Sequence, residues 1–236
     1  GVCCTPMMRK MLSFPKVTSA KITIAGLGIF EVFINGEKVS DDLFLPLSTD
    51  FHERPEKLYR GVPYDEKLRH RLYCPVYDIT SYLKEGENTI AFLMGPGWYE
   101  MPNECYEYGH IKLCYVIDWQ DEKGEKHRAG SDGSHKWKES YVKKANLLKG
   151  EVHDYRDYDE TWMQAPYDDS DWTAVCLEKA PETHFYIQDC PADRVIRHIT
   201  PQLLAEKGDV RIYDAGEIIT GYPVLVSDAP AGEGIT

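Results

Sequence analysis

The chain has 236 residues, enough for one large domain or two small ones. Its 27 Lys and Arg residues against 39 Asp and Glu give a net charge of −12, which argues against nucleic acid or an anionic membrane as a partner, because phosphates would be repelled. At 42% hydrophobic residues there is enough apolar material for a packed core, and no run approaches the roughly 18 apolar residues that a membrane span needs.

Short alternating segments dominate the first part of the chain, as is typical of half-buried strands. The first predicted strand covers residues 21–25. In the second, Phe30, Val32 and Ile34 alternate with other residues and run into Asn35-Gly36, the strongest two-residue hairpin signal. Residues 37–39 are therefore predicted to return as the partner strand.

The middle of the chain contains the clearest helix signal and another strand. A short helix is predicted over residues 81–84, with Asp78 or Thr80 as its N-cap and Gly86 as its end. A strand is predicted over residues 89–94. No window sustains a helical hydrophobic period beyond about three turns.

Residues 111–119 give the most regular strand pattern. Ile111, Leu113, Tyr115, Ile117 and Trp119 fall on one face, which we expect to be buried.

Strands are also predicted at residues 210–213 and 223–226, and the composition changes near residue 190. We therefore expect an N-terminal segment (1–18), a β-sandwich domain (19–189) and the beginning of a second β-sandwich domain (190–236). Many short strands at regular spacing predict an all-β fold of the sandwich or jelly-roll type.

The cysteines favour neither a metal site nor a disulfide framework. There are seven, an odd number, and none has the CxxC spacing of zinc sites or thioredoxin-like motifs. Cys105 and Cys114 could meet across a hairpin, or they could be buried free thiols.

The motifs of several enzyme classes are missing from the sequence. Gly26-Leu-Gly28 follows an apolar strand, but Glu31 stands where a dinucleotide-binding turn needs a third glycine. No P-loop, no HExxH zinc motif and no GxSxG nucleophile elbow occurs.

Paired carboxylates are frequent between residues 154 and 171, at Asp157 with Asp159 and at Asp168-Asp169 with Asp171. Such pairs could flank a glycosidic bond as acid and base, or they could hold calcium. The alternative is an acidic turn capped by its own Asp and Ser side chains.

The segment 95–103 combines turn residues with aromatic and amide side chains. Gly95-Pro96-Gly97 lets the backbone turn, and Trp98, Tyr99 and Asn103 follow. An aromatic platform beside polar groups is the composition of a sugar-binding loop. The alternative is that Trp98 closes the end of the sandwich core.

The ordered series of motifs resembles the N-terminal β-sandwich region of bacterial α-L-rhamnosidases, from about residue 21 to residue 236. The matching residues are 30–39, 45–50, 76–80, Leu83, 86–88, 97–99, 131–134, Trp137, 150–151, 154–156, Trp162, 167–172, Pro201 and 210–221.

This resemblance implies part of a multidomain glycoside hydrolase that releases terminal α-L-rhamnose with inversion. It further implies that the catalytic acid and base belong to an (α/α)6 barrel following these sandwiches, so that we expect the chain to be truncated before the barrel and inactive alone. Some members have a calcium-dependent rhamnose-binding module here. Trp98, Tyr99 and Asn103 are then the candidate sugar-binding residues and Asp50 the candidate metal ligand, with Asn103 as a second candidate ligand for calcium.

Three positions depart from the family pattern. Residues 216–222 lack the usual Gln-Asn pair, Tyr155 replaces an alanine, and Phe51 replaces a tyrosine. These differences leave the expected fold intact and point to a non-standard specificity.

Three hypotheses follow. The chain is a non-catalytic, carbohydrate-binding piece of a rhamnosidase-like enzyme; or a purely structural support of the barrel without sugar affinity; or a glycosidase in its own right that uses residues 154–171. No cofactor is required, with calcium as the one candidate. We expect a periplasmic or extracellular location rather than a cytoplasmic one, because glycoside-degrading enzymes are often exported.

Overall fold

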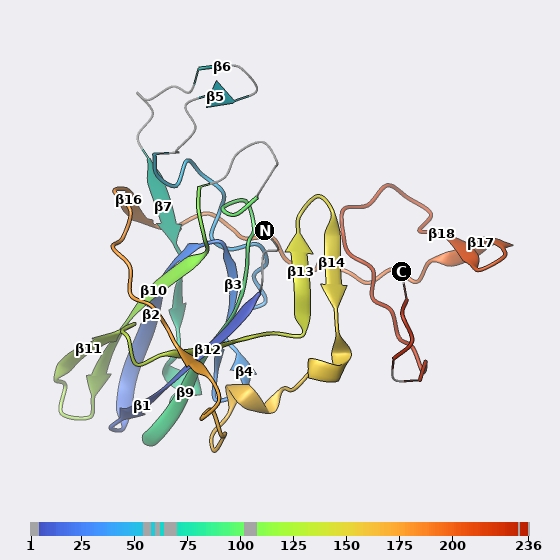
Figure 1. Cartoon of the computed structure of the whole chain (residues 1–236). Coiled ribbons are helices and arrows are strands. Elements are labelled where there is room, and N and C mark those ends of the chain that lie inside the picture. The colour runs from blue at the N-terminus through green and yellow to red at the C-terminus, as the bar shows by residue number, and fades with distance from the viewer. Residues whose placement is uncertain are drawn as a thin grey trace. The chain divides into compact units, whose positions relative to one another are not determined.

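A computed structural model describes residues 5–53, 58–59, 62–63, 70–101, 108–230 and 232–235 (Figure 1). Within these residues the secondary structure consists of β-strands and three short 3-10 helices, and no α-helix is present. No helix in this described part is long and apolar enough to cross a membrane. The all-β prediction is confirmed.

The larger sheet has six strands in the order β15-β12-β1-β9-β3-β4, and every pairing in it is antiparallel. In chain order its strands are β1 (Pro6–Phe14), β3 (Ile29–Ile34), β4 (Glu37–Lys38), β9 (Gly86–Gly95), β12 (Lys136–Glu139) and β15 (Thr173–Ala174). Since β1 pairs with both β9 and β12, residues 6–14 of the predicted N-terminal segment form an interior strand of the larger sheet.

The smaller sheet has four antiparallel strands in the order β11-β10-β2-β8. Its strands are β2 (Val17–Leu27), β8 (Val76–Asp78), β10 (Lys112–Asp121) and β11 (Lys126–Gly130). Strands β10 and β2 pair over almost their whole length. The two sheets together make the sandwich that the sequence predicts (Figure 1).

The main core lies between these sheets and is built from alternate residues of their strands. Ile22 and Ile24 of β2, Phe92 of β9 and Ile117 of β10 are all fully buried in one cluster. The five residues predicted to share a face of the 111–119 segment all belong to this cluster or pack against it. That prediction is confirmed.

Four smaller pairs complete the description. They are the hairpins β5 (Leu58–Tyr59) with β6 (Val62–Pro63), β13 (Val142–Asn146) with β14 (Gly150–His153) and β17 (Gln202–Lys207) with β18 (Val210–Asp214), and the parallel pair β7 (Arg71–Cys74) with β16 (His184–Ile187). The 3-10 helices are η1 (Thr80–Tyr82), η2 (Tyr155–Asp157) and η3 (Thr161–Met163).

The predicted hairpin at Asn35-Gly36 is present between β3 and β4. Both turn residues have positive φ, 53° at Asn35 and 88° at Gly36, as this type of tight turn requires. The strands predicted at residues 21–25, 89–94 and 210–213 are also present, within β2, β9 and β18.

One local prediction holds in part and another is wrong. The helix predicted at 81–84 is the single 3-10 turn η1 at Thr80–Tyr82, in which the Thr80 N–H and hydroxyl both donate to the Asp78 carboxylate. Residues 223–226 form no strand, because no described segment pairs with them, and Val224, Leu225 and Val226 are exposed.

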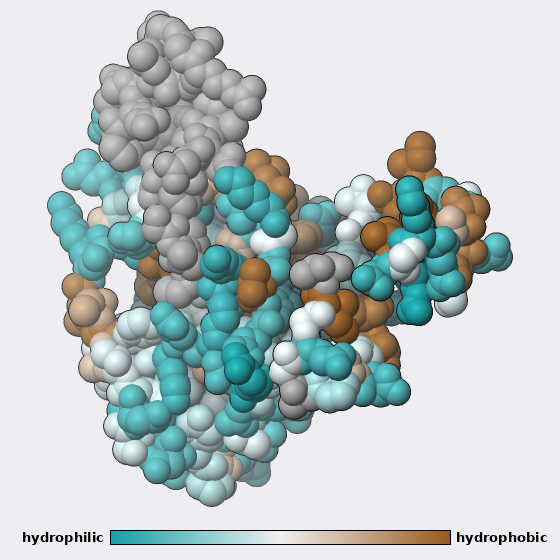
Figure 2. Space-filling model, turned by 45° about the vertical axis from the view of Figure 1, so that its right-hand side comes forward, coloured by the Kyte–Doolittle hydropathy of each residue, from teal (hydrophilic) through white to brown (hydrophobic). Residues whose placement is uncertain are grey.

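The chain divides into two compact units, Gly1–Ala192 and Asp193–Thr236. The first contains the sandwich. The second contains the β17–β18 hairpin, all of whose residues are exposed. Whether residues 190–236 begin a second sandwich stays a prediction. Apolar side chains are visible on the molecular surface as brown patches in Figure 2.

Candidate functional site

The aromatic loop begins where β9 ends at Gly95. The carbonyl oxygen of Pro96 accepts hydrogen bonds from the N–H groups of Tyr99 and Glu100, both at 3.2 Å. Gly97 has a φ of 52°, and a Cβ atom there would lie 2.7 Å from the Ile29 side chain. Both the backbone conformation and the lack of space therefore require glycine at this turn.

Trp98 and Tyr99 have opposite environments although they are neighbours in the sequence. Trp98 is 40% exposed, whereas Tyr99 is 1% exposed. Of these two side chains, only that of Trp98 therefore offers its ring face to a ligand.

Tyr99 belongs to a buried aromatic cluster with Phe51, His52 and Tyr108. Its ring stacks on Tyr108 at 5.7 Å between centroids and meets Phe51 edge to face. The Tyr99 hydroxyl lies 2.6 Å from His52 Nε2. Burial raises the pKa of Tyr99 to about 12 and lowers that of His52, so both side chains are neutral near pH 7. Tyr99 fixes the loop on the sandwich.

Asp50, the candidate metal ligand, lies beside this cluster. Its Oδ1 accepts a hydrogen bond of 2.8 Å from the Tyr108 hydroxyl, and its backbone carbonyl oxygen accepts one from the N–H of Arg71. Calcium takes six to eight oxygen ligands, and among the described residues no group of three or more acidic, histidine or cysteine side chains includes Asp50. Its role as a calcium ligand stays a prediction.

Glu100 holds together the base of the loop that follows. One carboxylate oxygen lies 2.9 Å from His110 Nδ1, and the other accepts a hydrogen bond from the Ile111 N–H at 3.1 Å. Asn103, the remaining candidate sugar-binding residue, lies outside the described residues.

A cavity of about 1040 Å³ adjoins the loop base. Its lining includes Glu100 and His110 from that base, Leu27 and Leu72 from the aromatic cluster's surroundings, and Phe185 of β16. The lining combines apolar side chains with a few polar groups, which is the general character of a small-molecule site.

The carboxylates between residues 154 and 171 are occupied by cations and turn N–H groups. Asp154 binds Arg156, whose hydrogen bond lowers the pKa of Asp154 to about 2. Asp168 caps the turn at Ser170, as the alternative interpretation predicts, and hydrogen bonds from the side chain and the backbone N–H of Ser170 lower its pKa. Asp169 pairs with Arg9 and Lys136.

A general acid needs a raised pKa to hold its proton near neutral pH. The environments of Asp154 and Asp168 have the opposite effect. The described part of this tract is therefore built as ion pairs and capped turns, and it does not resemble an acid–base pair.

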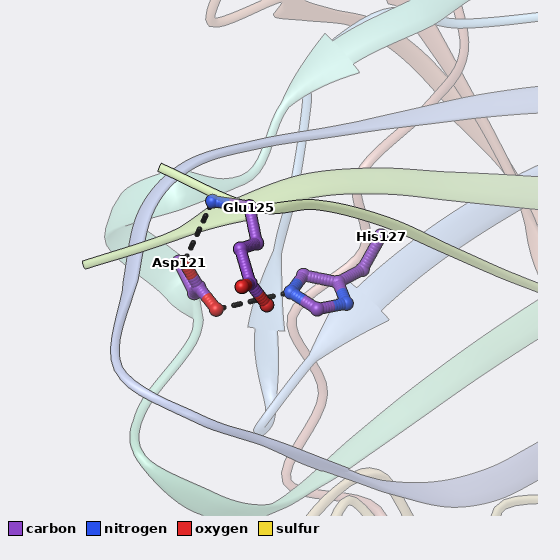
Figure 3. Close-up of side chains that lie close together, drawn as sticks. All are labelled: Asp121, Glu125 and His127. Carbon is purple, nitrogen blue, oxygen red and sulfur yellow. Dashed lines mark hydrogen bonds and ion pairs between the residues drawn. The ribbon is translucent and has the colours of Figure 1, made fainter. Parts of the chain in front are cut away.

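A separate cluster lies at the hairpin between β10 and β11, where Asp121, Glu125 and His127 converge (Figure 3). Each offers one ligand atom, and these atoms lie within 4.8 Å of one another. His127 Nε2 lies 3.0 Å from Asp121 Oδ2, and this hydrogen bond lowers the pKa of Asp121. Nothing in the sequence analysis singled out these residues.

The described cysteines carry free thiols. Cys74 is buried, and burial raises its pKa to about 11, whereas Cys114, Cys176 and Cys190 are exposed. The expectation of buried thiols is therefore wrong for Cys114. Its suggested partner, Cys105, lies outside the described residues.

Comparison with known protein families identifies the family of this chain. The sequence model of the alpha-L-rhamnosidase N-terminal domain matches residues 15–60 and 62–197. The chain belongs to this family. The resemblance predicted from the ordered motifs is thus confirmed.

Curated relatives include an alpha-L-rhamnosidase of Formosa agariphila, 29% identical over 89% of this chain, and one of Streptomyces avermitilis, 26% identical over 94%. The chain spans about a fifth of their lengths, 21% and 20% respectively.

Solved structures agree. The alpha-L-rhamnosidase from Dictyoglumus thermophilum has a TM-score of 0.78 at 27% identity, over 91% of this chain and 22% of that one. The Aspergillus terreus enzyme, at 22% identity, has a TM-score of 0.77 over 92% of this chain and 24% of its own, and shows the same fold.

Within this family domain, sequence reasoning found Trp98 and Tyr99 but missed their neighbours. His52 and Tyr108 reach Tyr99 from segments 47 and 9 residues away, and no local pattern reports such contacts. The one available signal was the run Asp50-Phe51-His52, which combines polar and aromatic side chains.

Proposed function

We propose that this chain is a non-catalytic accessory module of an α-L-rhamnosidase-like glycoside hydrolase, and that it binds a rhamnose-containing glycoside on the face of Trp98. The observation that carries the binding role is the contrast within the loop: the exposed indole of Trp98 is next in sequence to Tyr99, which is packed in a buried aromatic cluster. Such a platform suits the C–H face of a sugar, and rigidity lowers the entropic cost of binding.

The non-catalytic role is supported by the engaged carboxylates of residues 154–171. In this proposal the acid and base that release terminal α-L-rhamnose belong to an (α/α)6 barrel of the whole enzyme. We propose a periplasmic or extracellular location for that enzyme. The chain alone is expected to hydrolyse no aryl rhamnoside, and hydrolysis abolished by Asp168→Asn would overturn the non-catalytic assignment.

Calorimetric titration with L-rhamnose tests the binding role, run once with calcium and once with a chelator. Saturable heat that disappears in Trp98→Ala supports the proposal, since loss of a stacking platform is expected to weaken affinity by about tenfold or more. Tyr155→Ala is the matched control, because Tyr155 is an exposed aromatic side chain (67%) in η2, another segment of the same unit. Equal affinity in Trp98→Ala and Tyr155→Ala would overturn the role of Trp98.

A second candidate function is purely structural support of the catalytic barrel. The exposed apolar residues after residue 193, among them Ile212, Ile218 and Val226, favour it. No heat in either titration, with the protein folded, would establish this candidate in place of sugar binding. Heat that depends on calcium would support calcium as part of the sugar site, and its loss in Asp50→Asn would identify Asp50 as a ligand.

A further inference from the structure

The β10–β11 hairpin, at the edge of the smaller sheet, places three metal-ligating side chains on one face. Successive residues of a strand point to opposite faces, so Trp119 and Asp121 share a face of β10, and Glu125 and His127 share a face of the returning strand. Trp119 pairs directly with His127 in the register. All four side chains therefore lie on the same side.

The turn holds Asp121 in place. Asp121 Oδ1 accepts hydrogen bonds from the N–H groups of Lys123 and Glu125, both at 2.9 Å. Gly124, at φ 81°, donates to the Asp121 carbonyl oxygen. Oδ1 is thus committed to the backbone, while Oδ2 points to His127 (Figure 3).

The imidazole of His127 is held on its other side by Trp119. The two rings stack with centroids 5.3 Å apart and planes 19° apart. Trp119 is itself anchored to the core by an edge contact with Phe14. The ring nitrogen Nε2 is therefore aimed at Asp121 by packing as well as by the hydrogen bond.

The spacing of these atoms suits a bound cation. Two ligand atoms on one zinc ion, each about 2.0–2.1 Å from it, lie about 3.3 Å apart in tetrahedral geometry. His127 Nε2 and Asp121 Oδ2 are 3.0 Å apart, and the ligand atom of Glu125 lies within 4.8 Å of both. A change of side-chain rotamer at the exposed Glu125 would bring its carboxylate to the same ion as the other two ligands.

We propose that Asp121, Glu125 and His127 form a site for a divalent transition-metal ion of the zinc type. One imidazole nitrogen with two carboxylates favours zinc and its first-row neighbours over calcium and magnesium, which prefer oxygen ligands alone. The ion neutralises the two carboxylates and joins the two arms of the hairpin. Three protein ligands leave at least one position for water.

Titration of the whole chain with Zn²⁺ tests this site after iodoacetamide has blocked the thiols, since thiolates bind zinc strongly. One ion is expected to bind per chain. Loss of an outer-shell partner alone typically weakens metal affinity by about 10–100-fold, so Glu125→Gln and His127→Gln should each weaken it by at least about tenfold.

His153→Gln is the matched control. His153 Nε2 lies 2.7 Å from Glu151 Oε2 in another hairpin, so this pair also combines an imidazole with a carboxylate. Affinity unchanged in this variant supports the three-residue site. Equal weakening in all three variants, or none in Glu125→Gln and His127→Gln, would mean adventitious surface binding and overturn it.

Trp119 provides an independent readout. Ni²⁺, which is paramagnetic, is expected to quench Trp119 emission when it binds next to the stacked His127. In Trp119→Phe this quenching should disappear while calorimetric binding of Ni²⁺ persists. Quenching that survives in Trp119→Phe would place the ion elsewhere and contradict the proposal.

Discussion

Strands β9 and β18 are both rich in apolar residues, but β9 is mostly buried and β18 is exposed. Strand β9 pairs with β1 through residues 86–93 and with β3 through residues 90–95, and its residues Ile90, Ala91 and Phe92 are fully buried. In β18, Ile212 and Tyr213 are more than half exposed. The two strands lie in the two compact units, Gly1–Ala192 and Asp193–Thr236.

The difference shows that alternation of apolar and polar residues predicts a strand, but it does not predict which other element packs on its apolar face. The first unit has two sheets that bury each other's inner faces, as a sandwich must. The second unit has one two-stranded hairpin, and such a hairpin is marginally stable at best on its own in water. Its apolar residues Ile212 and Tyr213 are more than half exposed, and the chain spans about a fifth of the length of the relatives that it matches.

The sharpest test replaces one apolar residue in each unit. Phe92→Ala removes a fully buried ring from the sandwich core and is expected to lower the free energy of unfolding by about 3–5 kcal/mol. Ile212→Ala in the exposed hairpin is expected to change it by less than about 0.5 kcal/mol. Urea denaturation measures both. Similar losses would show that the hairpin is buried in solution.

Ion pairs in the two units should also differ in how much they contribute to the free energy of unfolding. Arg9 is 1% exposed, pairs with Asp169, donates to the Gln164 carbonyl oxygen at 3.1 Å and lies over the Tyr167 ring. Arg9→Ala should therefore cost about 3 kcal/mol of stability, since it removes a fully buried side chain together with its ion pair, its hydrogen bond and its contact with the Tyr167 ring.

The comparison is Arg211→Ala in the second unit, where the pair with Glu206 is exposed on both sides. Its removal should cost under about 1 kcal/mol. Chemical denaturation of both variants against the parent chain gives the two values, and a loss at Arg211 as large as that at Arg9 would contradict the division.

Local signals predicted what depends on neighbours in sequence. The Asn35-Gly36 turn and the buried face of residues 111–119 follow from turn chemistry and a period of two. The same local signals cannot tell Trp98 from Tyr99, because only Tyr99 is covered by His52 and Tyr108.

Predictions failed where a distant partner decides the outcome. Residues 223–226 have a strand-like composition, yet no described segment pairs with them. The parallel pairing of β7 with β16 joins segments more than a hundred residues apart and has no local signature. The cluster of Asp121, Glu125 and His127 depends on the hairpin register, which becomes known only when the pairing of both strands is known.

The stability of the first unit should also depend on pH through His135. This ring is buried, and its Nδ1–H donates to the Asp132 carbonyl oxygen while Nε2 accepts from the Tyr115 hydroxyl. Burial lowers its pKa, so the unfolded chain binds a proton more readily than the folded one. The contribution of neutral His135 to the free energy of unfolding is therefore complete above the unfolded pKa of about 6.5, and it is lost as the pH falls below that value.

We expect the free energy of unfolding to fall between pH 7.5 and pH 5, by less than the loss in Arg9→Ala. His135→Gln removes the titrating group and should flatten this slope, whereas His198→Gln in the exposed second unit should not. Denaturant midpoints at the two pH values give the slope. A slope unchanged in His135→Gln would assign it to other groups.

The smallest effect is expected when the whole second unit is removed. A chain ending at Ala192 keeps both sheets and the main core, since no residue of that core follows residue 117. Its unfolding midpoint should shift by less than about 2 °C, because about 1 kcal/mol corresponds to 2–4 °C at this size. Its binding of a hydrophobic dye should fall, since exposed residues such as Ile218 and Val226 are gone. A large drop in the midpoint would mean that the second unit packs on the sandwich and stabilises it.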